Sequence, residues 1–307
     1  MSRSLKDYAL VCLKGIAMGA ADVVPGVSGG TIAFIAGIYE EFITSLKSIN
    51  VNAIRIASKE GISAFWKHIH GSFLFSIFIG IGISIVSLAR LISILLEKHP
   101  VPIWSFFFGL IIASAFIVSS KINKWQVREI IALLFGAAIA YYITIASPAN
   151  TPETSWFIFC SGMLAICAMM LPGISGSFIL LLLGKYAFII NAVADKKISI
   201  LALFAAGCVA GLLSFSHLLS WMFRKFHDLT VAVLTGFMVG SLNKVWPWKI
   251  ATESRLIGGS PKIISEKAVL PGNYQGDPHL LSAILFVSIG FLLIIALERI
   301  AVSRKNS

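Results

Sequence analysis

Two short motifs in this sequence place proline, glycine and serine in the middle of long apolar segments: PGVSGG at residues 25–30 and PGISGS at residues 172–177. Proline fixes its own φ and lacks an N–H, and glycine tolerates positive φ, so each motif is expected to end one helix and begin another. The new helix starts with unpaired N–H groups at the positive end of its dipole. Such donors, with serine hydroxyls beside them, suit the binding of an anion such as phosphate.

We therefore expect the two motifs to form a phosphate site deep in the molecule. The residues assigned to it are Pro25, Gly26, Ser28, Gly29, Gly30 and Thr31 from the first motif, and Pro172, Gly173, Ser175, Gly176 and Ser177 from the second. The alternative is that each motif is only a tight turn between packed helices. Its recurrence at equivalent positions favours binding, because packing alone seldom needs the same broken segment twice.

Few charged residues lie within the apolar regions, and charge at that depth is by default a sign of function. Arg90 and His217 are equivalent under a shift of 127 residues, and we expect them to receive an anionic head group on the two sides of the membrane. The alternatives are a snorkelling arginine and a buried structural imidazole. Asp22 either orients the first broken loop or binds a coupling H⁺ or Na⁺. Lys14 and Lys185 either pair with carboxylates or reach the ligand.

The composition indicates a membrane protein. Hydrophobic residues make up 57% of the chain and charged ones 13%, with a mean hydropathy of +0.89, whereas soluble domains carry about 25% charged residues. The net charge of +11 does not indicate nucleic-acid binding, because the basic residues lie between apolar runs and form no patch. The four cysteines lie in apolar runs without metal-ligand spacing, so neither a disulfide, a metal nor a cofactor is expected.

The apolar segments predict the transmembrane organisation. A spanning helix needs about 20 apolar residues, and the candidates are 72–96, 101–120, 127–146, 198–223, 229–245 and 279–300. Two longer regions, 5–48 and 153–192, contain the motifs and are predicted to be broken or re-entrant hairpins. Residues 49–70 are predicted to form an amphipathic helix at the membrane interface, and residues 246–278 a polar loop.

The chain also contains an internal repeat. A shift of 147 residues aligns the motifs, and shifts of 147 and 127 align the pairs Gly15/Gly162, Gly37/Gly184, Tyr39/Tyr186, Gly80/Gly207 and Gly109/Gly236. We predict a single integral membrane domain, 1–307, with repeats at 5–146 and 153–300. Each repeat holds one broken hairpin and three spans and so crosses the membrane an odd number of times. The expected fold is therefore an all-α polytopic membrane protein with an inverted tandem repeat.

The distribution of basic residues predicts the orientation. If the N-terminus lies in the cytoplasm, the predicted cytoplasmic segments contain more Lys and Arg than the predicted outer segments. This distribution favours a cytoplasmic location for both termini. The basic N-terminal segment is expected to be retained, because Lys14 interrupts the apolar core that a signal peptide would need.

These residues resemble the family catalogued as domain of unknown function 368. The resemblance covers nearly the whole chain and rests on KGIAMGAADVVPGVSGGTIAFIAGIYEEFI at 14–43, FFFGLIIAS at 106–114, MLPGISGSFILLLLGKY at 170–186 and GFMVGSLNKVWPWK at 236–249. It implies a PopT-type translocase that returns undecaprenyl phosphate, the lipid carrier of cell-wall synthesis, to the cytoplasmic leaflet of the bacterial inner membrane. The implied partner is thus a polyprenyl phosphate lipid, and no covalent chemistry is required.

Two other classes of protein fit parts of the pattern. BacA-type undecaprenyl pyrophosphate phosphatases have a similar PG-x-SRSG motif, but Gly29 and Gly176 stand where those enzymes carry arginine, and their paired glutamates have no counterpart in an apolar segment. An ion-coupled transporter of a small soluble anion fits the inverted repeat equally well. A lipid substrate predicts a side opening toward the bilayer, and a soluble anion predicts an aqueous vestibule.

Overall fold

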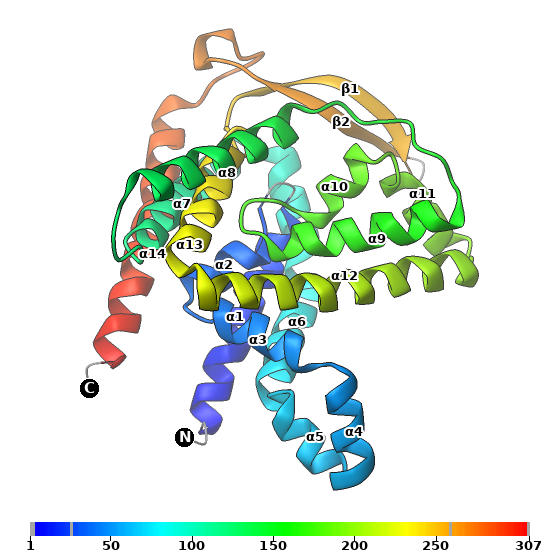
Figure 1. Cartoon of the computed structure of the whole chain (residues 1–307). Helices are drawn as coiled ribbons and strands as arrows, with labels where there is room; N and C mark the ends of the chain where they lie inside the picture. Colours follow the sequence, from blue (N-terminus) through cyan, green and yellow to red (C-terminus); the bar gives the residue numbers. More distant parts are fainter. Residues whose placement is uncertain (1–3, 25–26, 258–259, 306–307) are drawn as a thin grey trace.

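The computed structural model describes residues 4–24, 27–257 and 260–305 of the chain (Figure 1), so the predicted site residues Pro25 and Gly26 lie outside the described residues. In chain order the elements are α1 (Leu5–Val23), α2 (Gly29–Ile35), α3 (Tyr39–Ser48), α4 (Val51–Glu60), α5 (Ile62–His68), α6 (Gly71–Lys98), α7 (Pro100–Ser119), α8 (Val127–Ile145), α9 (Ser155–Met170), α10 (Gly176–Leu182), α11 (Tyr186–Ala194), α12 (Ile198–Lys225), α13 (His227–Ser241), β1 (Lys249–Ile257), β2 (Ser260–Ala268), η1 (Pro271–Asn273) and α14 (Leu280–Lys305).

Both predicted hairpins are broken at their motifs. The helices α1 and α9 each end at an extended residue, Val24 or Leu171, that precedes a proline in the sequence. Proline disfavours the helical conformation of the residue before it, which explains both ends. Ser28 and Ser175 then act as N-caps of the short helices α2 and α10. The local rules that predict these breaks are therefore sufficient to place them.

Glycine turns connect each short helix to the helix that follows it. Gly37 and Gly184, which stand 147 residues apart, have φ values of +69° and +64°. Residues with a Cβ rarely adopt this region, so glycine is favoured at both turns. The second turn bends the chain sharply, because α10 and α11 lie at 107° to each other.

Glycines allow the long helices to pack closely in matching pairs. Gly15 of α1 contacts the backbone of α6, and its equivalent Gly162 of α9 contacts the backbone of α12. Gly80 of α6 and Gly207 of α12 return these contacts, onto α1 and α9 respectively. Close backbone approach at small residues is how helices associate in membranes, where burial of apolar surface provides no driving force.

The helices α7, α8, α13 and α14 pack in pairs that join the two halves of the chain. Gly109 of α7 lies against Val287 of α14, and Gly236 of α13 lies against Leu133 of α8. Each pair joins a helix of the first half to a helix of the second. The inverted relation between the halves stays a prediction, although the glycine contacts correspond.

Five described helices are long and apolar enough to cross a membrane: α6, α7, α8, α12 and α14. They coincide with five of the six predicted spans. The sixth, predicted at 229–245, is the 15-residue α13, which ends at Ser241 and is too short to span alone. Ten of its 15 residues are buried, so α13 is surrounded largely by protein. A full membrane span at 229–245 therefore stays a prediction.

Two segments between the spans also differ from expectation. Residues 246–278 are not only a loop, since β1 and β2 pair there as an antiparallel hairpin. Apart from this hairpin the regular structure of the described residues is helical, which agrees with the predicted all-α polytopic membrane protein. A Gly-Gly pair between two short runs that contain isoleucine is a sequence signal for such a hairpin. Residues 49–70 form two helices, α4 and α5, because Gly61 with φ +87° separates them. Their exposed apolar residues include Val51, Ile54 and Ile62.

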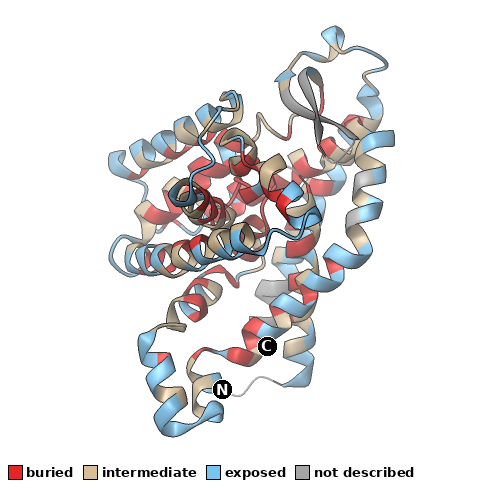
Figure 2. Ribbon diagram, turned by 90° about the vertical axis from the view of Figure 1, so that its right-hand side faces the viewer, coloured by how far each residue is buried: buried red, intermediate tan, exposed pale blue. Residues whose placement is uncertain are grey.

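Both termini lie at one end of the molecule together with α4 and α5, and the β-hairpin lies at the opposite end (Figure 1). In the same view α6 runs along the line from the termini to the β-hairpin, and α12 runs across that line. The pair α1–α6 therefore lies at a steep angle to the pair α9–α12. Buried residues gather in the interior of the molecule, and the outer helices expose much of their length (Figure 2). Exposed apolar side chains on these helices, such as those of Val86 and Leu281, suit contact with lipid.

We expect Gly80→Val to lower the free energy of unfolding by about 1–3 kcal/mol, because the new side chain would meet the carbonyl of Cys12 on α1. Thermal unfolding of the purified protein in detergent measures the change. Gly82 lies on the same helix and faces open space, so Gly82→Val is the matched control. Equal destabilisation by the two variants would contradict the packing role of Gly80.

Candidate substrate-binding site

The N-terminus of α2 is buried, and its first backbone donors are bonded within the protein. Ser28 Oγ accepts the N–H of Gly30 at 3.1 Å and donates to the carbonyl of Met169 at 3.0 Å. Asp22 Oδ1 accepts the N–H of Gly29 at 2.7 Å. Asp22 therefore contacts the broken loop directly, and the choice between its two predicted roles, loop orientation and ion coupling, stays open. In this arrangement neither glycine N–H is open to a ligand.

The two broken segments meet at this point. The Tyr39 hydroxyl donates to the carbonyl of Met170 at 2.8 Å, and the N–H of Gly173 donates to Thr31 Oγ1 at 3.0 Å. The positive end of α2 thus faces the negative, C-terminal end of α9. Gly30 permits this approach, because a Cβ there would lie 2.9 Å from the carbonyl oxygen of Met170. Predicted site residues separated by more than 140 positions are therefore brought into contact.

The second motif is less completely sealed. Ser175 Oγ accepts the N–H of Phe178 at 3.2 Å and lies 3.1 Å from the hydroxyl of Ser177, whose residue is exposed. Gly173 has φ +88°, and a Cβ there would lie 2.7 Å from Ser241 Oγ of α13. The other residues of the motif are buried: Pro172, Ile174 and Gly176. The second motif thus presents a hydroxyl at the surface, whereas Ser28 and Thr31 of the first are fully buried.

Lysines bind the opposite, C-terminal end of α2. Lys14 Nζ donates to the carbonyl of Ala36 at 2.7 Å, and Lys121 Nζ donates to the carbonyl of Phe34 at 3.4 Å. Cations are favoured at this end of a helix. Lys185, only 2% exposed, donates to a carbonyl of the linker that precedes α9. Lys121 was not predicted as a site residue, because by sequence it belongs to a polar loop after a span.

The structure does not bring Arg90 and His217 to the broken segments. Both residues are exposed, on α6 and α12. His217 Nδ1 lies 2.7 Å from the carbonyl of Leu213 in its own helix. Across the described part of the chain, no hydrogen bond or ion pair joins either side chain to α2 or α10. Their expected role in head-group binding stays a prediction.

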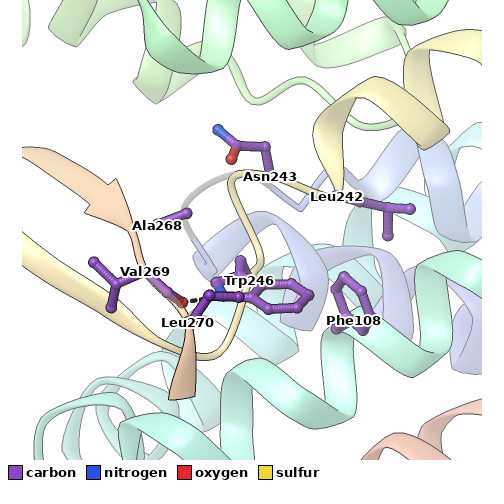
Figure 3. Close-up of a pocket in the computed structure, with 7 residues that line it drawn as sticks. All are labelled: Phe108, Leu242, Asn243, Trp246, Ala268, Val269 and Leu270. Atoms are coloured by element: carbon purple, nitrogen blue, oxygen red, sulfur yellow. Dashed lines mark hydrogen bonds between the residues drawn. The ribbon is translucent and has the colours of Figure 1, made fainter. Parts of the chain in front are cut away.

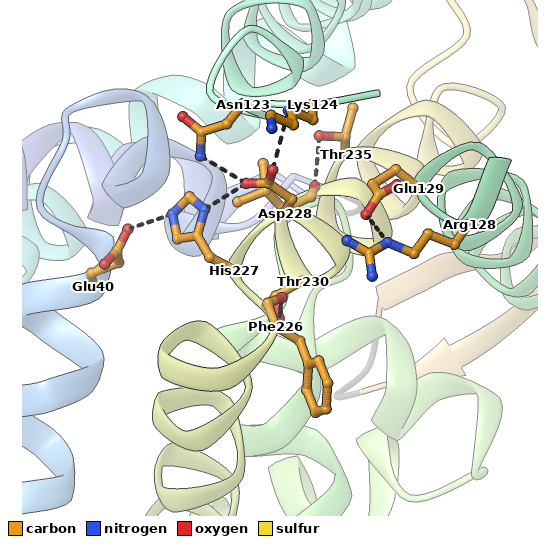
Figure 4. A network of polar contacts seen from close by, with 11 residues as sticks. Glu40, Asn123, Lys124, Arg128, Glu129, Phe226, His227, Asp228, Thr230 and Thr235 are labelled. Atoms are coloured by element: carbon orange, nitrogen blue, oxygen red, sulfur yellow. Dashed lines mark hydrogen bonds and ion pairs between the residues drawn. The ribbon is translucent and has the colours of Figure 1, made fainter. Parts of the chain in front are cut away.

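A polar network joins α3, the loop before α8 and the start of α13 (Figure 4). His227 lies between Glu40, at 3.6 Å, and Asp228, at 3.1 Å. Asp228 also accepts from the Asn123 side chain at 3.0 Å and from the Lys124 N–H at 3.2 Å. The network ties the two halves together away from the motifs. Nowhere in the described ranges do three or more His, Cys, Asp or Glu side chains gather as metal ligands would.

A basic cluster lies against the second broken segment. Glu266 Oε2 on β2 is 3.2 Å from Lys244 Nζ and 3.5 Å from Lys249 Nζ. Lys244 Nζ lies 4.6 Å from the ring centre of Phe178 on α10, and Lys249 Nζ lies 3.3 Å from that of Trp104 on α7. The sequence did not predict this cluster, because Glu266 lies on β2 and is separated from the two lysines along the chain by the length of β1 and the turn of the hairpin. Both lysines do belong to the family motif at 236–249.

Burial sets the electrostatics of this cluster. It lowers the pKa of Lys249 to about 7, with Glu266 opposing the shift and Lys244 adding to it. Burial also raises the pKa of Glu266, but the two lysines outweigh that effect and hold it below its usual range. Two lysine amines therefore share one carboxylate in a poorly hydrated place.

An apolar pocket of about 400 Å³ lies beside the cluster (Figure 3). The ring of Trp246 packs edge-on against Phe108 with centroids 5.3 Å apart, and its Nε1 donates to the carbonyl of Val269 at 2.8 Å. Leu242 and Leu270 complete the apolar wall, and Asn243 supplies a polar group. Phe108 stands one helical turn after Trp104, so the pocket and the cluster share one face of α7.

The sequence profile of the undecaprenyl phosphate translocase-like family matches residues 18–259, which include both motifs. The chain belongs to this family. It is 44% identical to a polyprenyl-phosphate transporter of Vibrio cholerae over 98% of this chain and 99% of that protein. It is 36% identical to a polyprenyl-phosphate transporter of Staphylococcus aureus over 76% of this chain and 85% of that protein. No solved structure gives a significant match. The chain is therefore a multi-pass membrane translocase and not an enzyme.

We expect Tyr39→Phe to lower the free energy of unfolding by about 1 kcal/mol, because it leaves the buried carbonyl of Met170 without its donor. Thermal unfolding in detergent measures the loss. Tyr186 is the equivalent residue of the second half, and its hydroxyl has no hydrogen-bond partner in the described part of the chain. Tyr186→Phe is thus the matched control, and equal shifts for the two variants would refute the contact.

We expect Lys249 to titrate at about pH 7, far below an ordinary lysine. Glu266→Gln should lower the midpoint further, because the carboxylate stabilises the charged amine. NMR of ¹³C-methylated lysines, assigned with Lys249→Arg, follows the titration. A titration midpoint at about 10.4, the pKa of an exposed lysine, would contradict the burial of this side chain.

Proposed function

We propose that this translocase moves a polyprenyl phosphate, the class of lipid named for its relatives, between the leaflets of the bacterial cytoplasmic membrane. Family membership supports the substrate class. The observation that carries the mechanism is the meeting of two broken segments at a buried point where hydroxyl and N–H groups of both converge. A phosphate cannot enter hydrocarbon bare, since even a single charged side chain costs several kcal/mol there. Polar groups at this depth would replace its hydration.

The head group binds where the broken segments meet. Its partners are the hydroxyls and N–H groups of the two loops, namely Ser28, Gly29, Gly30 and Thr31 with Gly173, Ser175, Gly176 and Ser177, while the outward-facing Arg90 and His217 meet it only on entry or exit. In the closed arrangement the loop donors are taken by Asp22 and by each other. Binding therefore requires α2 to move away from α9 and Asp22 to release Gly29. The polyprenyl tail stays in lipid throughout.

The two halves alternate access to this site. The matching glycine contacts of α1–α6 and α9–α12 support a common origin of the halves. The odd number of crossings predicted for each repeat supports their inversion. Rocking of one inverted repeat against the other opens a central site to each side in turn. With both termini in the cytoplasm, the β-hairpin faces the outside, and net movement returns the lipid to the cytoplasmic leaflet.

Proteoliposomes that contain undecaprenyl phosphate test the function. A membrane-impermeant phosphatase added outside hydrolyses the lipid of the outer leaflet only, so movement appears as a second, slower release of phosphate. We expect this phase with the protein and not in empty liposomes, with its rate compared with and without imposed H⁺ or Na⁺ gradients. Absence of movement under every gradient would overturn the proposal. Uptake of free phosphate without lipid movement would favour the soluble-anion alternative.

We expect Asp22→Asn to bind the lipid roughly tenfold more tightly, because it keeps an oxygen acceptor for Gly29 but removes the charge that competes with phosphate. Binding of a short-chain polyprenyl phosphate to the protein in nanodiscs measures the change. Asp22→Ala should be less stable, since it loses the acceptor altogether. Unchanged binding by Asp22→Asn, together with a lost gradient response, would instead assign ion coupling to this residue.

A further inference from the structure

The cluster of Lys244, Lys249 and Glu266 is the largest concentration of nearly buried charge outside the broken segments in the described part of the chain. The three side chains are 12%, 6% and 20% exposed. With both amines protonated, one carboxylate leaves a surplus positive charge. A charge removed from water is costly unless a counter-ion accompanies it. The cluster therefore favours the binding of a further anion.

The neighbours of the cluster restrict what that anion can be. Lys244 lies over the ring of Phe178, whose N–H is bonded to the predicted site residue Ser175. An anion held by Lys244 would thus stand next to the second broken segment. Lys249 lies over Trp104, one helical turn from the pocket residue Phe108. An anionic group and an apolar chain can therefore be bound side by side along α7.

The pocket has the character of a site for a hydrocarbon chain. Its lining is apolar and aromatic apart from Asn243, and its volume of about 400 Å³ lies in the usual range of small-molecule sites, about 300–1,000 Å³. This space suits the first isoprene units of a longer chain. The combination of a phosphate-sized basic cluster with a short apolar pocket fits a lipid-linked phosphate better than a free one.

We propose that Lys244, Lys249 and the pocket around Trp246 form a docking site in which a lipid-linked phosphate monoester binds before it passes to the broken segments. The phosphate replaces the Glu266 carboxylate between the two amines, and the first part of the chain lies against Trp246 and Leu270. Glu266 is then an internal competitor that occupies the amines between cycles. This site rests on the proposed function and adds to it the place where the substrate first binds.

Binding of a short-chain polyprenyl phosphate to the full-length protein in nanodiscs tests the site, and the tryptophan fluorescence around the pocket reports it. We expect Lys244→Ala/Lys249→Ala to bind at least about tenfold more weakly, because two charged contacts are lost. Lys267→Ala, which removes an exposed lysine from the same strand, should bind as the unaltered protein does. Equal affinity of the double variant and the unaltered protein would overturn the site.

Glu266→Gln tests the same site if the double variant does not fold. It removes the competitor and retains both amines, so we expect severalfold tighter binding, the opposite of what general damage to the hairpin would cause. Weaker or unchanged binding by this variant overturns the proposal. Thermal unfolding of each variant reports whether the hairpin remains folded.

Three further ligands distinguish the source of the phosphate. We expect polyprenyl phosphate to bind more tightly than inorganic phosphate, the corresponding polyprenol and phosphatidylglycerol. Equal binding of inorganic phosphate would remove the role of the pocket, and equal binding of polyprenol would remove that of the amines. Equal binding of phosphatidylglycerol would remove the selectivity for a polyprenyl phosphate monoester. Any of these results overturns the site.

Transport separates this inference from the proposed function. If the unaltered protein moves the lipid and the double variant does so equally fast, the docking site is wrong and the function stands. If the unaltered protein binds the lipid through these lysines but moves none, the proposed function is wrong.

Discussion

Backbone groups inside an apolar region must find partners within the protein, and the arrangement of the two broken segments follows from this constraint. A Pro-Gly break frees groups that a continuous helix would bond. Here the two halves bond each other: the last carbonyls of α9 accept the hydroxyls of Ser28 and Tyr39, and the Gly173 N–H reaches Thr31. Each segment thus takes the place of water for the other. In the proposed function, a phosphate that takes donors from one segment would also free acceptors of the other, so that binding and opening would be coupled.

Local rules were enough to predict the breaks and the long apolar helices, and they explain the glycine turns. The residue before a proline and the positive φ of Gly37 and Gly184 are properties of short stretches of chain. The contacts that close the site could not be predicted from the sequence. The Tyr39–Met170 bond joins positions 131 apart, and one sequence without homologues carries no record of such a pairing. The β-hairpin had a local signal in its two glycines, but the polar composition of the region obscured it.

The halves agree in backbone more closely than in polar side chains. Both place an N-capping serine and a glycine turn at equivalent positions. Yet Asp22, which fastens the first loop, has Met169 as its equivalent, and Thr31 has Phe178. The first loop is consequently held by more bonds than the second. In a carrier that alternates between two arrangements, such an inequality makes one of them the lower in free energy, and it thereby sets the resting orientation.

The exchange of partners between the halves has a consequence for biosynthesis. Gly109 of α7 packs against α14, the last helix in Figure 1, and α8 packs against Gly236 of α13. As the ribosome delivers the chain from its N-terminus, α7 and α8 enter the bilayer well before the helices that cover them. Assembly can therefore finish only after translation nears its end, and a truncated chain would leave two small-residue grooves open to unrelated membrane helices.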